Sequence, residues 1–264
     1  MNRIAAALLV FIATINSLSA LAAKTSVETI RESQEVIGQT VPNLVFTDTR
    51  GAPLPLSSMR GKPLIVNLVY TGCADACPAI VEKLAPAISA ARDALGEGSF
   101  AVLTIGFDTR NDTPQRMRAF AAAHNAGAPD WIFASGDAVT VATLSDAIGF
   151  SIDQSAGGFA HAAQVTILDR YGKVFAQVYG EDFATPAIVE PLKDAVWGRG
   201  RPLFSLAGLA DRVKLYCTVY DPNTGRYHFS YALFLSIAMG LTSLGAVLVV
   251  LVRETRRTIK SGGA

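Results

Sequence analysis

The feature of this sequence that most constrains its fold is a series of short apolar runs separated by segments with helical periodicity. The runs are rich in Val and Ile and cover residues 64–70, 100–107, 164–168 and 174–178. Nearly continuous apolar runs of this length are typical of strands that are buried on both faces. The Tyr171-Gly172 pair between the last two runs predicts a hairpin turn.

Segments with helical patterns lie between these predicted strands. Apolar side chains recur at helical spacing from Ile80 to Leu95, with Pro86 as an expected kink. Helix starts are predicted where a capping residue or an early proline stands, at Thr113-Pro114, Asp137 and Thr185-Pro186. Strands that alternate with helices indicate an α/β domain, with a mixed central sheet flanked by helices, over residues 24–200.

The N-terminal end of the chain has the pattern of a secretory signal peptide. Residues 1–23 contain one charged residue, Arg3, then an apolar run and the small residues Ala20-Leu21-Ala22 at a plausible cleavage site. An uncleaved anchor is the alternative. Both interpretations predict that the following domain is exported to the periplasm.

A second apolar segment, residues 229–252, contains no charged residue. It is long enough to cross a hydrocarbon core about 30 Å thick, and basic residues follow it. We therefore expect a C-terminal transmembrane helix, a juxtamembrane connector over 201–228 and a cytoplasmic basic tail over 253–264. A buried core helix is the alternative.

Charge excludes some classes of protein. The net charge is +1, which argues against nucleic-acid binding, and half of the residues are hydrophobic, which argues against disorder. The charged fraction of 17% is below the usual value of about 25%, and the two nearly charge-free ends account for much of the difference.

Two cysteines, Cys73 and Cys77, directly follow the first predicted strand. Pro78 fits the first helical position, so Cys77 is the expected N-cap of the next helix. Because a helix N-terminus stabilises anions, we expect lowered pKa values for both thiols. A structural disulfide is the alternative, although so short a loop would link no distant segments.

The cysteine spacing and His161 together suggest a metal site. Three residues separate the cysteines, one more than in the dithiol motif of thioredoxins. Two thiolates favour Cu(I) or zinc, but a site needs at least one further donor. A histidine near a loop is more often merely solvated. In a thioredoxin-like arrangement, however, the segment with His161 faces the cysteine loop.

The chain resembles the SCO/SenC family of thioredoxin-like copper chaperones for cytochrome c oxidase assembly. The similarity covers most of residues 38–198 and rests on GKPLIVNLVYTGCADACP, GFDTRNDTPQRM, and the His161 segment followed by VTILDRYGK. It implies that Cys73, Cys77 and His161 bind copper, as Cu(I) and also as Cu(II). It also implies a partner, either a copper-accepting oxidase subunit or another copper chaperone. Asp108 matches an acidic position that would lie near the metal or face a partner, or would simply be an exposed carboxylate.

The sequence departs from the family pattern beside the candidate ligands. The family usually has proline after the first cysteine, where this chain has Ala74. It usually has aspartate and serine around the histidine, where this chain has Ala160 and Ala162. Loss of the carboxylate next to the imidazole is expected to lower metal affinity more than it changes metal identity.

These observations favour a copper-binding metallochaperone over an enzyme. The alternative is a thiol–disulfide oxidoreductase, in which Cys73, as the more exposed thiol, attacks a partner and Cys77 resolves the mixed disulfide. A peroxidase-like enzyme is disfavoured because no activating arginine arrangement stands near Cys73. Cys217 is a free reactive thiol, an intermolecular disulfide partner or a buried inert thiol, and the sequence assigns it no role.

Overall fold

The computed structural model describes residues 28–73, 76–124, 130–155, 158–161, 163–198, 213 and 217–261. The chain divides into two compact units, Met1–Arg201 and Pro202–Ala264. The predicted signal peptide over 1–23 lies outside the described residues, as does most of the connector before residue 217.

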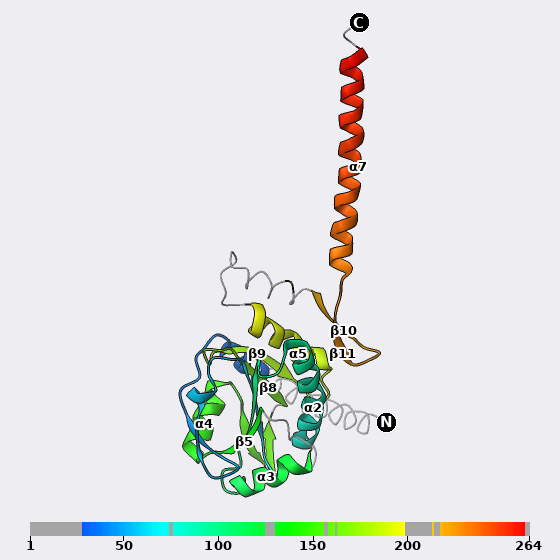
Figure 1. Cartoon of the computed structure of the whole chain (residues 1–264). Coiled ribbons are helices and arrows are strands. Elements are labelled where there is room, and N and C mark those ends of the chain that lie inside the picture. The colour runs from blue at the N-terminus through cyan, green and yellow to red at the C-terminus, as the bar shows by residue number, and fades with distance from the viewer. Residues whose placement is uncertain are drawn as a thin grey trace, which may run out of the picture. The chain divides into compact units, whose positions relative to one another are not determined.

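A seven-stranded sheet forms the centre of the first unit, in the order β2-β1-β5-β4-β3-β8-β9 (Figure 1). The neighbours β3, β4 and β5 run parallel, and the other pairs are antiparallel, which confirms the predicted mixed sheet. The strands are β1 (Val45–Asp48), β2 (Pro53–Pro55), β3 (Leu64–Val69), β4 (Ala101–Gly106), β5 (Trp131–Ser135), β8 (Gln164–Leu168) and β9 (Val174–Tyr179). Gly172 adopts a φ of +81° in the predicted turn between β8 and β9.

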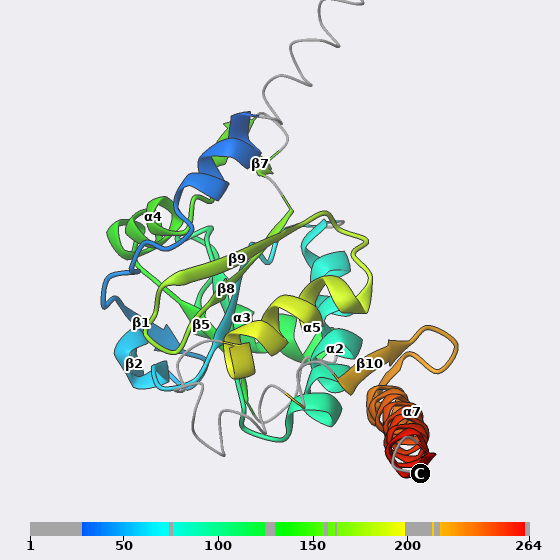
Figure 2. The ribbon, with the colours of Figure 1, turned by 90° about the horizontal axis from the view of Figure 1, so that it is seen from above.

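Helices cover both faces of this sheet, which is why every residue of β3 and β4 is buried. The α-helices of this unit with assigned bounds are α2 (Ala76–Leu95), α3 (Pro114–Ala123), α4 (Ala138–Ala147) and α5 (Thr185–Lys193). Figure 2 shows α2 and α5 side by side, with α4 across the sheet from them. Two predicted caps are confirmed, because Thr113 accepts the Arg116 N–H and Asp137 accepts the Thr140 N–H.

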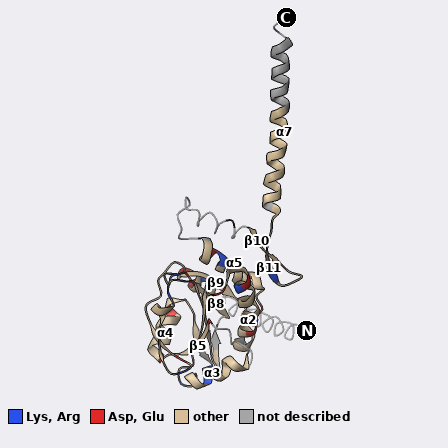
Figure 3. Ribbon diagram, viewed as in Figure 1, with Lys and Arg blue, Asp and Glu red and all other residues tan. Residues whose placement is uncertain are grey.

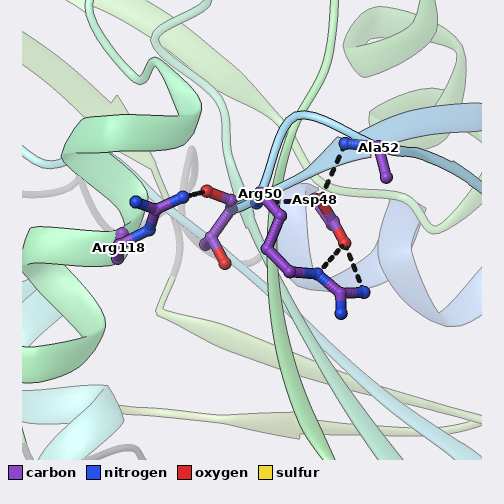
Figure 4. Close-up of polar contacts among 5 residues, drawn as sticks. Asp48, Arg50, Ala52 and Arg118 are labelled. Atoms are coloured by element: carbon purple, nitrogen blue, oxygen red, sulfur yellow. Dashed lines mark hydrogen bonds and ion pairs between the residues drawn. The ribbon is translucent and has the colours of Figure 1, made fainter.

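The turn between β1 and β2 is held by one carboxylate. Asp48 Oδ1 accepts the backbone N–H groups of Arg50 and Ala52 at 2.8 and 2.9 Å, and Oδ2 accepts the Arg50 guanidinium (Figure 4). Arg118 of α3 donates to the Thr49 carbonyl beside it. The Ala52 N–H and then the Arg50 guanidinium hold the pKa of Asp48 below its ordinary value.

A small two-stranded sheet precedes β8. Its strands, β6 (Ile152–Ser155) and β7 (Gly158–His161), pair antiparallel, with Ile152 opposite His161. His161 is therefore the last residue of a strand rather than part of a loop.

The second unit contains the hairpin β10 (Thr218–Asp221) and β11 (Arg226–Phe229), followed by α7 (Ala232–Ser261). The run predicted to be one membrane-spanning segment is divided: Phe229 ends β11 opposite Thr218, and α7 begins only at Ala232. Figure 3 shows no charged residue on the N-terminal part of this helix, whereas charged residues are spread over the first unit.

The predicted transmembrane helix over 229–252 is wrong. Within the described part of the chain, no helix combines the length and the apolar character needed to cross a membrane. The predicted topology of a single C-terminal transmembrane helix with a cytoplasmic tail over 253–264 is wrong for the same reason. The sequence pattern misled because an apolar run does not reveal that its first residue, Phe229, pairs in a hairpin.

Candidate functional site

The two cysteines lie where strand β3 gives way to helix α2. The Cys73 N–H donates to the Tyr70 carbonyl at 3.1 Å, which tightens the turn after the strand. The Cys77 N–H points at Cys73 Sγ, with 3.4 Å between nitrogen and sulfur. The predicted pair is therefore brought together, at the carboxyl edge that β3 shares with β4 and β5.

The two thiols differ in burial. Cys73 is partly exposed, whereas Cys77 is 0% exposed. Burial raises the pKa of the Cys77 thiol far above its ordinary value. The expectation of a lowered pKa is thus wrong for Cys77, because loss of hydration of the thiolate outweighs the helix N-terminus. Cys77 also lies inside the first turn of α2, since that helix begins at Ala76.

Asp112 ties the cysteine loop to the loop between β4 and α3. Its Oδ1 accepts the backbone N–H and the hydroxyl of Thr71 at 2.8 and 2.7 Å. Its Oδ2 accepts the Asp108 N–H at 2.9 Å. The side chain is almost fully buried, and burial raises the pKa of Asp112 despite these three hydrogen bonds. One carboxylate therefore fixes the backbone two residues before Cys73.

Gly106, the last residue of β4, leaves the space that this carboxylate occupies. A Cβ at position 106 would overlap the Asp112 side chain and would lie 2.8 Å from Met117 Sδ. Contacts this short force neighbouring atoms to move. The absence of a side chain at Gly106 is thus a condition for the Asp112 hydrogen bonds.

Tyr70 connects the cysteines to β7. Its hydroxyl hydrogen-bonds to the Cys73 side chain and to the backbone of Phe159, and burial together with Cys73 raises the pKa of Tyr70. The ring centroids of Tyr70, Phe107 and Phe159 are 5.2 Å apart in each pair. Phe159 lies two residues before His161 in the same strand.

The remaining residues singled out from the sequence are His161, Asp108 and Cys217. The backbone of His161 ends β7, but its side chain lies outside the described part of the structure, so the three-ligand set is still a prediction. Within the described side chains, no three His, Cys, Asp or Glu residues gather as a metal site. Asp108 is half-buried, and its carboxylate accepts the Asn111 amide at 2.7 Å. Cys217 is buried in the second unit.

Sequence reasoning missed Asp112, the Tyr70 hydroxyl and the ring of Phe159. A signal existed for Asp112, because it stands beside the predicted cap Thr113 and follows a parallel strand adjacent to the cysteine strand. No such local signal existed for Phe159, whose partners lie about 50 and 90 positions away along the chain.

Comparison with known proteins gives a family and several similar structures. A family model described as SCO1/SenC matches residues 34–196. A structure from Aquifex aeolicus VF5, described as a candidate electron transfer protein, is 26% identical, with a TM-score of 0.57 and coverage of 62% of this chain and 96% of that one.

Two further similar structures share the fold at lower identity. Bradyrhizobium japonicum ScoI with copper bound is 21% identical, with a TM-score of 0.51 and coverage of 59% and 99% of the two chains. BsSco, described as having a disulfide switch and as a member of the Sco family of cytochrome c oxidase assembly proteins, is 19% identical, with a TM-score of 0.50 and coverage of 60% and 93%.

Proposed function

Because the chain belongs to the SCO1/SenC family, we propose that it is a copper-binding chaperone that acts in cytochrome c oxidase assembly. The observation that supports this best is the pair of thiols at the end of β3, with the Cys77 N–H directed at Cys73 Sγ. The copper bound to ScoI and the assembly role given for BsSco extend to this chain as part of the proposal.

The proposed ligands are Cys73, Cys77 and His161. Two thiolates and one imidazole form a soft, three-coordinate set that suits Cu(I), and Cu(II) is the second oxidation state proposed. The thiols must lose their protons to bind the metal. Since burial raises the pKa of Cys77, copper affinity is expected to fall as the pH falls.

Unequal burial of the two sulfurs suggests how copper leaves. Cys73 is partly exposed and can be approached by a partner, whereas Cys77 is enclosed. A thiolate of the partner would first replace Cys73 on Cu(I), and Cys77 would be released later. Such stepwise ligand exchange changes no oxidation state. The proposed partner is a copper-accepting oxidase subunit or another copper chaperone.

The test is a Cu(I) titration of the reduced full chain against a chromophoric Cu(I) chelator. The parent is expected to bind about one copper, and His161→Ala, Cys73→Ser and Cys77→Ser are each expected to bind more weakly. His228→Ala is the matched histidine control, because His228 lies in the hairpin of the second unit. Equal affinity of the parent and His161→Ala would remove His161 from the ligand set. Absence of Cu(I) binding by the parent would refute the proposal.

A thiol–disulfide oxidoreductase is the second proposal, and the same difference in burial supports it. A partly exposed Cys73 can attack a partner disulfide, and Cys77 lies close enough to displace the partner afterwards. Electrons would pass from the two thiols to the partner, leaving Cys73 and Cys77 joined by a disulfide. If His161→Ala binds copper as tightly as the parent and the chain still reduces a disulfide substrate, this second function is favoured.

A further inference from the structure

Three aromatic rings join the β6–β7 hairpin to the edge of the sheet that carries the cysteines. Tyr70 follows β3, Phe107 follows β4, and Phe159 lies in β7. The interplanar angles within the three pairs are 58°, 68° and 83°, so the rings meet at tilted or edge-on angles. Aromatic pairs favour such angles because the positive edge of one ring meets the negative face of the other.

The hairpin needs such an attachment. A two-stranded sheet of four-residue strands is at best marginally stable by itself in water. Phe159 packs against the core cluster of the domain, and its backbone also hydrogen-bonds to the Tyr70 hydroxyl. Tyr70, which contacts Cys73, therefore also contacts Phe159, both through its ring and through its hydroxyl.

Position 161 lies on the same face of β7 as this attachment. Residues two apart in a strand occupy the same face, so position 161 shares the face of β7 on which Phe159 packs. Tyr70 contacts Cys73 on one side and Phe159 on the other. A chain of contacts from the cysteine loop to β7 thus runs through Tyr70.

We propose that the ring cluster of Tyr70, Phe107 and Phe159 positions His161 for copper binding beside Cys73 and Cys77, with Phe159 as the positioning residue. The inference rests on the proposed copper-binding function. A ligand that occupies its binding position only part of the time weakens the apparent affinity by that fraction. Phe159 would act by keeping β7 in place.

A double-mutant cycle between Phe159 and His161 tests this. Cu(I) affinity of the reduced full chain is measured by chelator competition for the parent, Phe159→Leu, His161→Ala and the double variant. Phe159→Leu is expected to weaken binding about five- to tenfold, which matches the loss of two ring contacts. In the His161→Ala background the same substitution is expected to change nothing, because the residue it positions is gone.

Two controls separate positioning from general stability. Phe133→Leu removes a buried ring that stacks on Trp131 in β5, a strand separated from β3 by β4. It is expected to lower thermal stability without changing Cu(I) affinity. Tyr70→Phe keeps the ring and removes the hydroxyl, so it measures separately how much the hydroxyl contributes to Cu(I) affinity. X-ray absorption at copper is expected to show a weaker imidazole signal in Phe159→Leu than in the parent, while the sulfur signal stays.

The outcomes distinguish this inference from the proposed function. If the parent does not bind Cu(I), or binds it without His161, both fall. If the parent depends on His161 but Phe159→Leu binds as tightly as the parent, or loses affinity equally with and without His161, only the positioning role falls. Phe159→Met, which keeps an apolar side chain without a ring, takes the place of Phe159→Leu in the cycle if that variant does not fold.

Discussion

Two nearly buried aspartates in this domain each hold a turn, but their environments differ. Asp48 holds the β1–β2 turn through two backbone N–H groups and has the Arg50 guanidinium beside it. Asp112 holds the cysteine loop through Thr71 and Asp108, and no ion pair is found for it within the described residues. The pKa of Asp48 is lowered, and the pKa of Asp112 is raised.

The difference shows that the depth of burial decides whether hydrogen bonds can keep a carboxylate charged at a turn of this kind. At Asp48 the hydrogen bonds and the guanidinium together outweigh the cost of removing the carboxylate from water. At Asp112 three hydrogen bonds do not, because the group is deeper and the Asp108 carboxylate lies nearby. The turn that holds the candidate site is therefore the one whose anchor is held less favourably in its charged form.

Removing the Asp112 carboxylate is expected to have the largest effect. Asp112→Ala leaves the N–H groups of Thr71 and Asp108 without their acceptor, and it should lower the free energy of unfolding by about 3 kcal/mol. Because the loop that carries Cys73 loses its attachment, Cu(I) affinity should also fall at least about tenfold. Urea denaturation and chelator competition measure the two effects. Unchanged copper affinity in a folded Asp112→Ala would show that the loop needs no anchor.

The matching change at the other turn should affect stability alone. Asp48→Ala removes the acceptor of the Arg50 and Ala52 N–H groups and should lower the free energy of unfolding by about 2 kcal/mol. Cu(I) affinity should stay at the parent value, because the β1–β2 turn lies on strands remote in sheet order from β3. A fall in copper affinity equal to that of Asp112→Ala would erase the distinction between the two turns.

The pH dependence of stability should separate the two aspartates by sign. A carboxyl whose pKa is lowered by folding stabilises the protein above its unfolded pKa of about 3.9, and this contribution disappears as the pH falls. The parent's advantage over Asp48→Asn should therefore shrink as the pH falls from about 5 to about 2. A raised pKa has the opposite effect, so the parent should gain relative to Asp112→Asn as the pH falls. Urea denaturation across this range measures the free energies of unfolding of the parent and of both variants. If the difference between parent and variant changed with pH in the same direction at both aspartates, the comparison would be contradicted.

The smallest effect is expected at the cation itself. The Arg50 side chain is 83% exposed, so its ion pair with Asp48 is screened by water. Arg50→Ala should lower the free energy of unfolding by about 0.5 kcal/mol at low salt, and by less at high salt. Thermal unfolding at two salt concentrations checks this. Arg31→Ala is the control, because Arg31 forms exposed ion pairs with Glu28 and Glu35 within the helical residues 28–35.

Much of the fold could be predicted because its signals are local. The apolar runs at 64–70 and 100–107 correspond to β3 and β4, and the caps at Thr113 and Asp137 act through N–H groups three residues away. The juxtaposition of Cys73 and Cys77 also follows from short-range spacing after a buried strand. Each of these features depends on residues that are neighbours in the chain.

The errors arose where distant segments decide the outcome. The pKa of Cys77 depends on what covers the first turn of α2, and that cover comes from other parts of the chain. The apolar run from Phe229 was predicted to be one helix because its composition is uniform, but pairing with Thr218 makes its first residue part of a strand.

Local patterns along the chain were enough to predict the alternation of strands and helices, the mixed sheet and the two thiols at the end of its first long strand. Periodicity, capping and spacing act over a few residues, so they can be read along the chain. The packing of distant segments is what makes Asp112 anchor the cysteine loop, encloses Cys77 and brings Tyr70 against both Cys73 and Phe159. Burial and side-chain contact depend on which distant segments the fold brings together.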